Sequence, residues 1–89
     1  MISFSLYYMP TCPYCVIVLD WLKKHKRTVE LRDVDAHERF ARELIAEGGI
    51  DQVPCLRIEQ DGTVRWLYES ADIVAFLATA PAKASSKKN

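Results

Sequence analysis

The chain has 89 residues and a formal net charge of zero, with 49% hydrophobic and 27% charged residues, which is the composition of one small globular domain. Zero net charge argues against a nucleic-acid or anionic-membrane partner, and no apolar run approaches the ~20 residues that span a membrane. The first residues lack the basic segment of a signal peptide, so we expect a cytoplasmic protein.

The spacing of apolar residues predicts four strands and three helices. In chain order these are a strand over residues 3–8, a helix over 13–24, a strand over 28–34, a helix over 36–47, strands over 53–58 and 63–68, and a helix over 70–80. This order, β-α-β-α-β-β-α, predicts an α/β fold with one mixed four-stranded sheet and helices on both faces. We expect the domain to span residues 1–81, and residues 82–89 to form a disordered basic tail.

Local signals mark where several of these elements begin and end. Thr11 is the expected N-cap of the first helix, with Pro13 as its first residue. Gly48-Gly49 is expected to end the second helix, and Ser70 is the expected N-cap of the third. Asp61-Gly62 predicts a hairpin turn between the last two strands.

The segment Cys12-Pro13-Tyr14-Cys15 is the strongest chemical signal in the chain. Two cysteines three residues apart, between a predicted strand and a predicted helix, are typical of a redox pair. The odd number of cysteines, three in all, also fits redox chemistry better than a framework of structural disulfides. Free N–H groups at the helix start favour a thiolate on Cys12, whereas Cys15 lies about one turn inside. We therefore expect Cys12 to be the nucleophile and Cys15 the resolving thiol.

Three segments give the chain a resemblance to the glutaredoxins over residues 3–80. They are Cys12-Pro13-Tyr14-Cys15, Val53-Pro54, and the run Tyr-Glu-Ser-Ala-Asp-Ile over residues 68–73. The chain looks most like small bacterial dithiol glutaredoxins, and it is also similar to the amino-terminal domain of glutathione S-transferases. The resemblance implies a thioredoxin fold and a glutathione-dependent thiol–disulfide oxidoreductase of cell redox homeostasis. It implies glutathione as co-substrate, no tightly bound cofactor, glutathionylated or disulfide-bonded proteins as substrates, and a monomer.

The same resemblance implies a glutathione site. Its residues would be Tyr14, Gln52, Val53, Pro54, Glu69, Ser70 and Asp72. In the family the proline of the Val-Pro pair is cis, which leaves the backbone N–H and C=O of the preceding residue free to pair with a peptide-like ligand. Glu69 and Ser70 match the pair that holds the α-amino and α-carboxylate ends of glutathione in the transferases, although simple capping of the last helix would also account for them.

Several positions depart from the family pattern. Met9 stands where most glutaredoxins have a lysine, Gln52 replaces the usual threonine, and Tyr68-Glu69 replaces a pair of glycines. Cys55 follows Pro54 directly, and we expect a buried, inert thiol rather than a third redox thiol. His25 and His37 are isolated and have no metal-ligand spacing, so no metal site is predicted.

Three other functions stay open at this point. One is a thioredoxin-like disulfide reductase that does not use glutathione, which the replacement of lysine by Met9 favours. Another is an iron–sulfur carrier, in which Cys12 and glutathione would hold a cluster between two chains. The third is transfer of glutathione to electrophiles, although the chain lacks the second, helical domain of the transferases.

Overall fold

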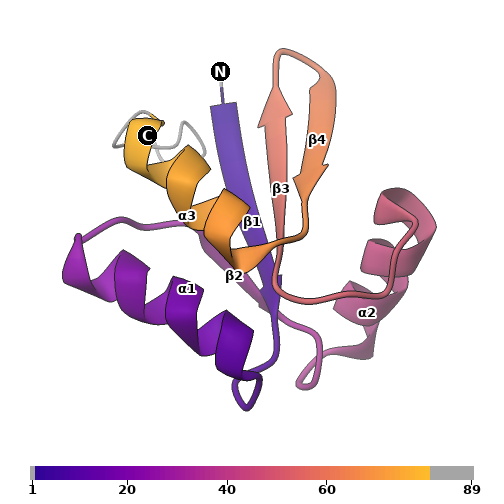
Figure 1. Cartoon of the computed structure of the whole chain (residues 1–89). Helices are drawn as coiled ribbons and strands as arrows, with labels where there is room; N and C mark the ends of the chain where they lie inside the picture. Colours follow the sequence, from indigo (N-terminus) through magenta and orange to yellow (C-terminus); the bar gives the residue numbers. More distant parts are fainter. Residues whose placement is uncertain (1, 81–89) are drawn as a thin grey trace.

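The computed structural model describes residues 2–80, and both Pro81 and the predicted tail over residues 82–89 lie outside these residues. The elements are β1 (Ile2–Tyr8), α1 (Pro13–Lys24), β2 (Glu30–Asp33), α2 (Glu38–Glu43), the π-helical turn η1 (Leu44–Gly48), β3 (Cys55–Gln60), β4 (Thr63–Leu67) and α3 (Ser70–Thr79) (Figure 1). The predicted order of strands and helices is therefore confirmed. Among residues 2–80, none of the helices has both the length and the apolar character needed to span a membrane.

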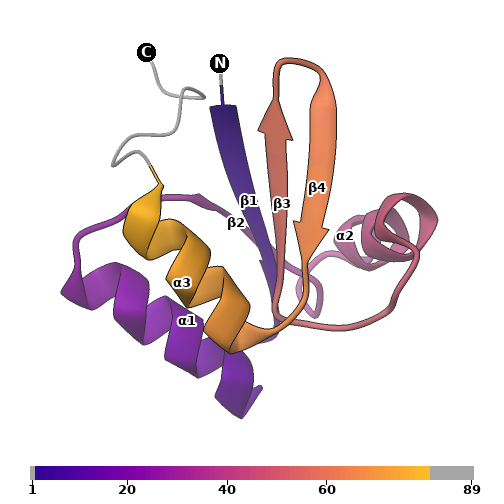
Figure 2. The same ribbon diagram turned by 45° about the horizontal axis from the view of Figure 1, so that its top comes forward.

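The four strands form one sheet in the order β2-β1-β3-β4. β1 pairs in parallel with β2 and antiparallel with β3, and β3 pairs antiparallel with β4. Helices α1 and α3 cover one face of the sheet and α2 covers the other (Figures 1 and 2). The prediction of a mixed four-stranded sheet with helices on both faces is confirmed.

The hydrophobic core has two parts, one on each face of the sheet. The larger part lies under α1 and α3 and contains Phe4, Leu6, Val18, Leu22, Val29, Leu56, Ile58, Ile73 and Leu77. The smaller part lies on the α2 face and contains Tyr7, Leu44 and Cys55. Leu6 and Tyr7 belong to opposite parts because successive side chains of a strand point to opposite faces.

α1 and α3 begin at the predicted residues, Pro13 and Ser70, but their N-caps each differ from the prediction by one residue. Cys12, not Thr11, is the N-cap of α1, with φ −80° and ψ 123°. A residue before proline is restricted to extended conformations, so Cys12, which precedes Pro13, cannot be helical. Glu69, not Ser70, is the N-cap of α3, and its carbonyl accepts the first helical hydrogen bond from the N–H of Ile73 at 2.9 Å. Neither cap makes a side-chain hydrogen bond to its helix.

Other boundaries follow from glycine and proline. The predicted strand over residues 53–58 instead spans Cys55–Gln60, because Pro54 has no N–H to donate to the sheet. The second helix ends as predicted, with Gly49 at φ +86° as the C-cap of η1. Asp61 and Gly62 both have positive φ, as the predicted hairpin turn requires.

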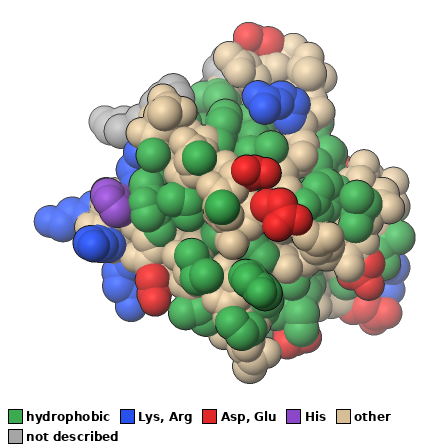
Figure 3. Space-filling view, in the orientation of Figure 1, with side chains coloured by type: hydrophobic (Ala, Val, Ile, Leu, Met, Phe, Trp, Pro, Cys, Tyr) green, Lys and Arg blue, Asp and Glu red, His purple; other side chains and the backbone are tan. Residues whose placement is uncertain are grey.

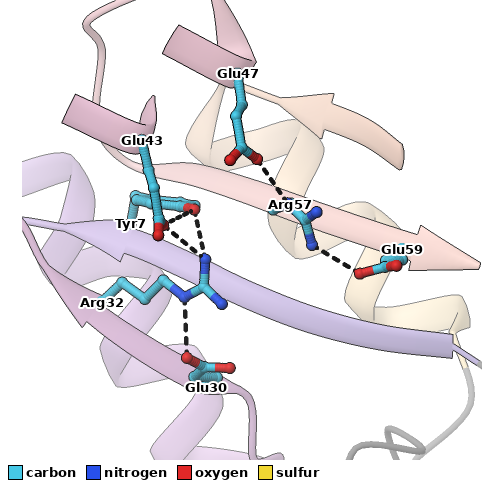
Figure 4. A network of polar contacts seen from close by, with 7 residues as sticks. All are labelled: Tyr7, Glu30, Arg32, Glu43, Glu47, Arg57 and Glu59. Carbon is cyan, nitrogen blue, oxygen red and sulfur yellow. Dashed lines mark hydrogen bonds and ion pairs between the residues drawn. The ribbon is translucent and has the colours of Figure 1, made fainter. Parts of the chain in front are cut away.

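A polar network fixes α2 and η1 on the sheet (Figure 4). The Tyr7 hydroxyl donates to Glu43 of α2 at 2.7 Å and accepts from Arg32 of β2 at 2.6 Å. Burial and the hydrogen bond to Glu43 raise the pKa of Tyr7 to about 12. Arg57 of β3 pairs with Glu47 of η1 at 3.7 Å. These contacts hold the carboxyl end of η1, from which residues 49–54 lead into β3.

Candidate active site

The two cysteines of the Cys-Pro-Tyr-Cys segment lie at the amino end of α1, and their environments differ. Cys12 is partly exposed, whereas Cys15 is fully buried. The backbone N–H of Met9 donates to the Cys15 sulfur at 3.4 Å, and the carbonyl of Met9 accepts from the N–H of Cys12 at 3.1 Å. Met9, in the loop before α1, is therefore hydrogen-bonded to both cysteines. Of the two thiols, that of Cys12 is the one that solvent can reach.

The electrostatic environments of the two thiols also differ. Partial burial raises the pKa of Cys12, but hydrogen bonds from the backbone N–H groups of Cys15 and Tyr14 and from the Cys15 thiol outweigh it, and the pKa of Cys12 falls below its ordinary value. Burial, and to a lesser extent the neighbouring Cys12, raises the pKa of Cys15 to about 12. Cys12 therefore ionises first, and Cys15 keeps its proton. This difference in pKa suits Cys12 to act as the nucleophile and Cys15 to act as the resolving thiol.

A groove opens beside these thiols, and we call it the cis-proline groove. Its volume is about 460 Å³, and it is lined by Tyr14, Gln52, Val53, Pro54, Tyr68, Glu69, Ser70 and Ala71. The peptide bond between Val53 and Pro54 is cis, as the resemblance implied. The groove brings together all the residues expected to bind glutathione except Asp72. Asp72 lies exposed in the first turn of α3 and is not among the lining residues.

Two lining residues were missed by the sequence analysis as site residues, namely Tyr68 and Ala71. Tyr68 and Ala71 belong to the run over residues 68–73 that carries the resemblance, but neither was predicted to bind the ligand. In the structure the hydroxyl of Tyr68 donates to the carbonyl of Gly48 at 2.7 Å, and the carbonyl of Tyr68 accepts from the side-chain amide of Gln52 at 3.2 Å. The glycine pair Gly48-Gly49 is the sequence signal that could have indicated this contact, because glycine often occurs where another group approaches the backbone closely.

Cys55 lies on the opposite side of the sheet from α1 and is fully buried against Tyr7 and Leu44. Burial raises its pKa to about 12, while a hydrogen bond with Tyr68 lowers it slightly. The prediction of a buried third thiol is confirmed, and at neutral pH this thiol keeps its proton.

The histidines take part in aromatic contacts. His25 stacks on Trp21 with ring centroids 4.4 Å apart, and His37 meets Phe40 edge-on at 5.4 Å. Within residues 2–80, no cluster of three or more His, Cys, Asp or Glu side chains is arranged to hold a metal ion.

A second groove lies between α1 and α3 and meets the cis-proline groove at Ser70 and Ala71. Its volume is about 690 Å³, and its lining is almost entirely apolar, with Ile17, Trp21 and Val74 among its residues. Figure 3 shows that hydrophobic side chains are numerous on the face that carries α1 and α3. The amino end of α3 therefore separates a polar groove from an apolar one.

Comparison with protein families gives one match. The family model described as glutaredoxin matches residues 4–63, which include Cys12, Cys15 and the Val53-Pro54 pair. A search of the curated proteins found no match.

Solved structures share the fold of this chain. The maleylacetoacetate isomerase of Anaeromyxobacter dehalogenans 2CP-1, solved with GSH bound in its active site, is 29% identical with a TM-score of 0.65; the match covers 85% of this chain and 36% of that one. The thioredoxin-like protein BC3987 is 25% identical with a TM-score of 0.63, over 84% of this chain and 100% of that one. The holo form of glutaredoxin C1 from Populus tremula x tremuloides, at 15% identity and a TM-score of 0.61 over 85% and 74% of the two chains, shows the same fold.

Proposed function

The chain belongs to the glutaredoxin family, and from that premise we propose that it is a glutathione-dependent thiol–disulfide oxidoreductase. Its substrates would be mixed disulfides between proteins and glutathione, and also protein disulfides. Thiol–disulfide exchange in general follows from the family and from the unequal pair Cys12 and Cys15. The use of glutathione as the reductant is the further step of the proposal.

In the proposed reaction, the Cys12 thiolate attacks the glutathione sulfur of a mixed disulfide. The bond between the protein sulfur and the glutathione sulfur breaks, and the protein thiolate leaves and takes up a proton. Glutathione is now bound to Cys12 through a disulfide. The thiolate of a second glutathione attacks the glutathione sulfur of this disulfide, glutathione disulfide leaves, and the Cys12 thiolate is restored. Overall, the mixed disulfide and one glutathione give the protein thiol and one glutathione disulfide, so one disulfide bond is exchanged for another.

Cys15 offers a second route for protein disulfides. After Cys12 has formed a mixed disulfide with the substrate protein, Cys15 attacks the Cys12 sulfur, and the protein leaves as a dithiol. Because Cys15 is buried with a pKa of about 12, it must lose its proton during this attack. Two glutathiones then reduce the Cys12–Cys15 disulfide.

The cis-proline groove is the observation that carries the use of glutathione. It is lined by Val53 next to the cis-proline, by Glu69 with its carboxylate, and by Ser70 at the amino end of α3. An extended peptide can pair with the Val53 backbone, a carboxylate can bind at the start of a helix, and an ammonium group can pair with Glu69. Glutathione carries all three groups. The similarity to the isomerase with bound GSH, at 29% identity, also supports the use of glutathione.

One observation favours a second candidate, a reductase that receives its electrons from a thioredoxin reductase. No lysine or arginine lines the cis-proline groove among the residues that the structure describes, and glutathione has a net negative charge. The test measures reduction of a small glutathione mixed disulfide, first with glutathione and glutathione reductase and then with a thioredoxin reductase. Turnover with glutathione supports the proposal, and turnover with thioredoxin reductase alone would replace it by the second candidate.

A further inference from the structure

We propose that Tyr68 is a positioning residue that holds the two sides of the cis-proline groove at a fixed separation. This inference rests on the proposed function, because the ligand whose binding it governs is glutathione. One side of the groove is formed by residues 52–54, which precede β3, and the other by residues 68–71, which lead into α3.

Tyr68 makes one hydrogen bond across the groove, to Gln52, and a second to Gly48, which precedes the other side of the groove. The Tyr68 hydroxyl donates to the carbonyl of Gly48 at 2.7 Å, at the point where η1 ends and the chain turns toward residues 52–54. The side-chain amide of Gln52 donates to the carbonyl of Tyr68 at 3.2 Å. The side chain of Tyr68 is therefore bonded to Gly48, just before the loop over residues 49–54. Its backbone carbonyl is bonded to Gln52, in the middle of that loop.

The Tyr68 hydroxyl also contacts the far end of the same loop. It lies close enough to the thiol of Cys55, the first residue of β3, to influence the pKa of that thiol. One phenol group thus touches the residues on both sides of the loop over residues 49–54. Cys55 is fully buried, so this end of the loop is held in the core.

The contact with Gly48 is close and depends on the absence of a side chain there. A Cβ atom on residue 48 would lie 2.8 Å from the Tyr68 hydroxyl oxygen and 3.0 Å from the ring of Trp66. Gly48 itself is held in place, because Arg57 of β3 pairs with the neighbouring Glu47 (Figure 4). The hydroxyl of Tyr68 therefore binds to a point that is fixed on the sheet.

The consequence for the proposed ligand follows from the chain order. Glu69 and Ser70, which would bind the γ-glutamyl end, come directly after Tyr68, and Val53 lies on the opposite side of the groove. Glutathione must contact both sides at once, so its binding depends on their separation. The backbone of Cys12 is held by hydrogen bonds with Met9 and with Val16 of α1, and Tyr68 takes part in neither bond. Loss of the Tyr68 hydroxyl should therefore weaken binding without changing the reactivity of Cys12.

The first test is Tyr68→Phe, which removes only the hydroxyl. We expect the KM for a glutathione mixed disulfide to rise by about two- to tenfold, the range that one typical hydrogen bond gives. The rate of Cys12 alkylation by iodoacetamide and the reduction of cystamine by dithiothreitol should not change. Tyr8→Phe is the matched control, because Tyr8 lies at the end of β1 and does not line this groove.

A second variant breaks the same contact and keeps the phenol. Gly48→Ala places a methyl group where the Tyr68 hydroxyl lies, so it should raise the KM to a similar extent. Because both changes remove one interaction, the double variant should show less than the product of the two single effects.

Hydrogen exchange provides a readout that does not depend on glutathione. In Tyr68→Phe, amides of residues 49–53 and 69–72 should exchange faster, while those of α1 stay as in the wild type. Unchanged exchange in these segments, or a KM that stays at the wild-type value in a folded variant, overturns the inference. If the wild-type protein reduces no glutathione mixed disulfide at all, the proposed function fails, and the exchange result alone decides the role of Tyr68.

Discussion

The difference between the three thiols leads to a prediction about their chemical modification. At pH 7 a thiol with a pKa of about 12, such as Cys15, is ionised in about one molecule in 100,000, roughly a thousandfold less than a thiol at the ordinary value of 9.0. Cys55 has the same raised pKa and is fully buried as well. Cys12 has a lowered pKa and is partly exposed. Since the thiolate is the nucleophile, one cysteine should react and two should not.

The assay is timed reaction of the reduced, folded protein with iodoacetamide at pH 7, followed by mass spectrometry of the intact chain and its peptides. We expect a single adduct, on Cys12, and its rate against pH should have a midpoint below that of a free thiol. Cys15→Ala should keep the single adduct but move the midpoint upward, because no side chain at residue 15 then donates to the Cys12 thiolate. The midpoint should stay below that of a free thiol, because the two backbone N–H donors remain.

Cys12→Ser is the decisive control. In this variant Cys15 loses the hydrogen bond and the charge of Cys12, which both raise its pKa, but it keeps the larger effect of burial. The folded variant should therefore still be alkylated very slowly at pH 7, and all cysteines should react once it is unfolded. Rapid alkylation of Cys15 in the folded Cys12→Ser protein would refute the reasoning, because burial would then not suppress its ionisation.

Three further predictions concern turnover of glutathione mixed disulfides. Cys12→Ser should abolish it, whereas Cys15→Ser should keep a substantial part and lose only the two-thiol route to protein disulfides; equal loss in both folded variants would contradict the assigned roles. Glu69→Ala and Ser70→Ala should both raise the KM. Ser70 is the first helical residue of α3 and not its N-cap. Ser70→Ala should therefore lower the free energy of unfolding by less than the ~0.5–2 kcal/mol that the loss of a cap costs. Met9→Lys should lower the KM by several-fold at most at low salt, because an exposed ion pair contributes only ~0.2–1 kcal/mol. This decrease in KM should vanish at high salt, where exposed charges are screened. An unchanged KM at low salt would mean that residue 9 does not reach the ligand.

The order of the elements was predictable because each one has a local signal. Alternating and helical spacing of apolar residues marked the strands and helices, and Gly49 and Asp61-Gly62 marked turns that need positive φ. The caps were each misplaced by one residue for a local reason too. Thr11 and Ser70 have side chains that favour capping, but Pro13 forces Cys12 into the extended position, and the first helical hydrogen bond of α3 is accepted by Glu69.

The groove was predictable only where a motif marked it. Gln52, Val53, Pro54, Glu69 and Ser70 line it because they belong to segments that the resemblance identified. Tyr68 was not predicted as a site residue, because its role depends on a contact with Gly48 twenty residues away. Such contacts arise from the pairing of β3 with β4, which places residue 67 opposite residue 56. No local pattern contains that information.

The support for thiol chemistry and the support for glutathione binding come from different parts of the chain. The family match ends at residue 63, so it includes Cys12, Cys15 and Pro54 but not Glu69 and Ser70. The match to the isomerase with bound GSH covers 85% of this chain and therefore extends beyond the family match. The thiols lie at the amino end of α1, whereas the second side of the groove is held by the hydrogen bonds of Tyr68 with Gly48 and Gln52. Because the hydrogen bonds of Tyr68 go to Gly48 and Gln52, we expect residues 68–72 to affect which reductant the protein accepts more than they affect the reactivity of Cys12. The thioredoxin-like protein and the isomerase both share this fold, so the identity of residues 68–72, more than the fold, is expected to decide between a glutathione-dependent and a thioredoxin-like reductase.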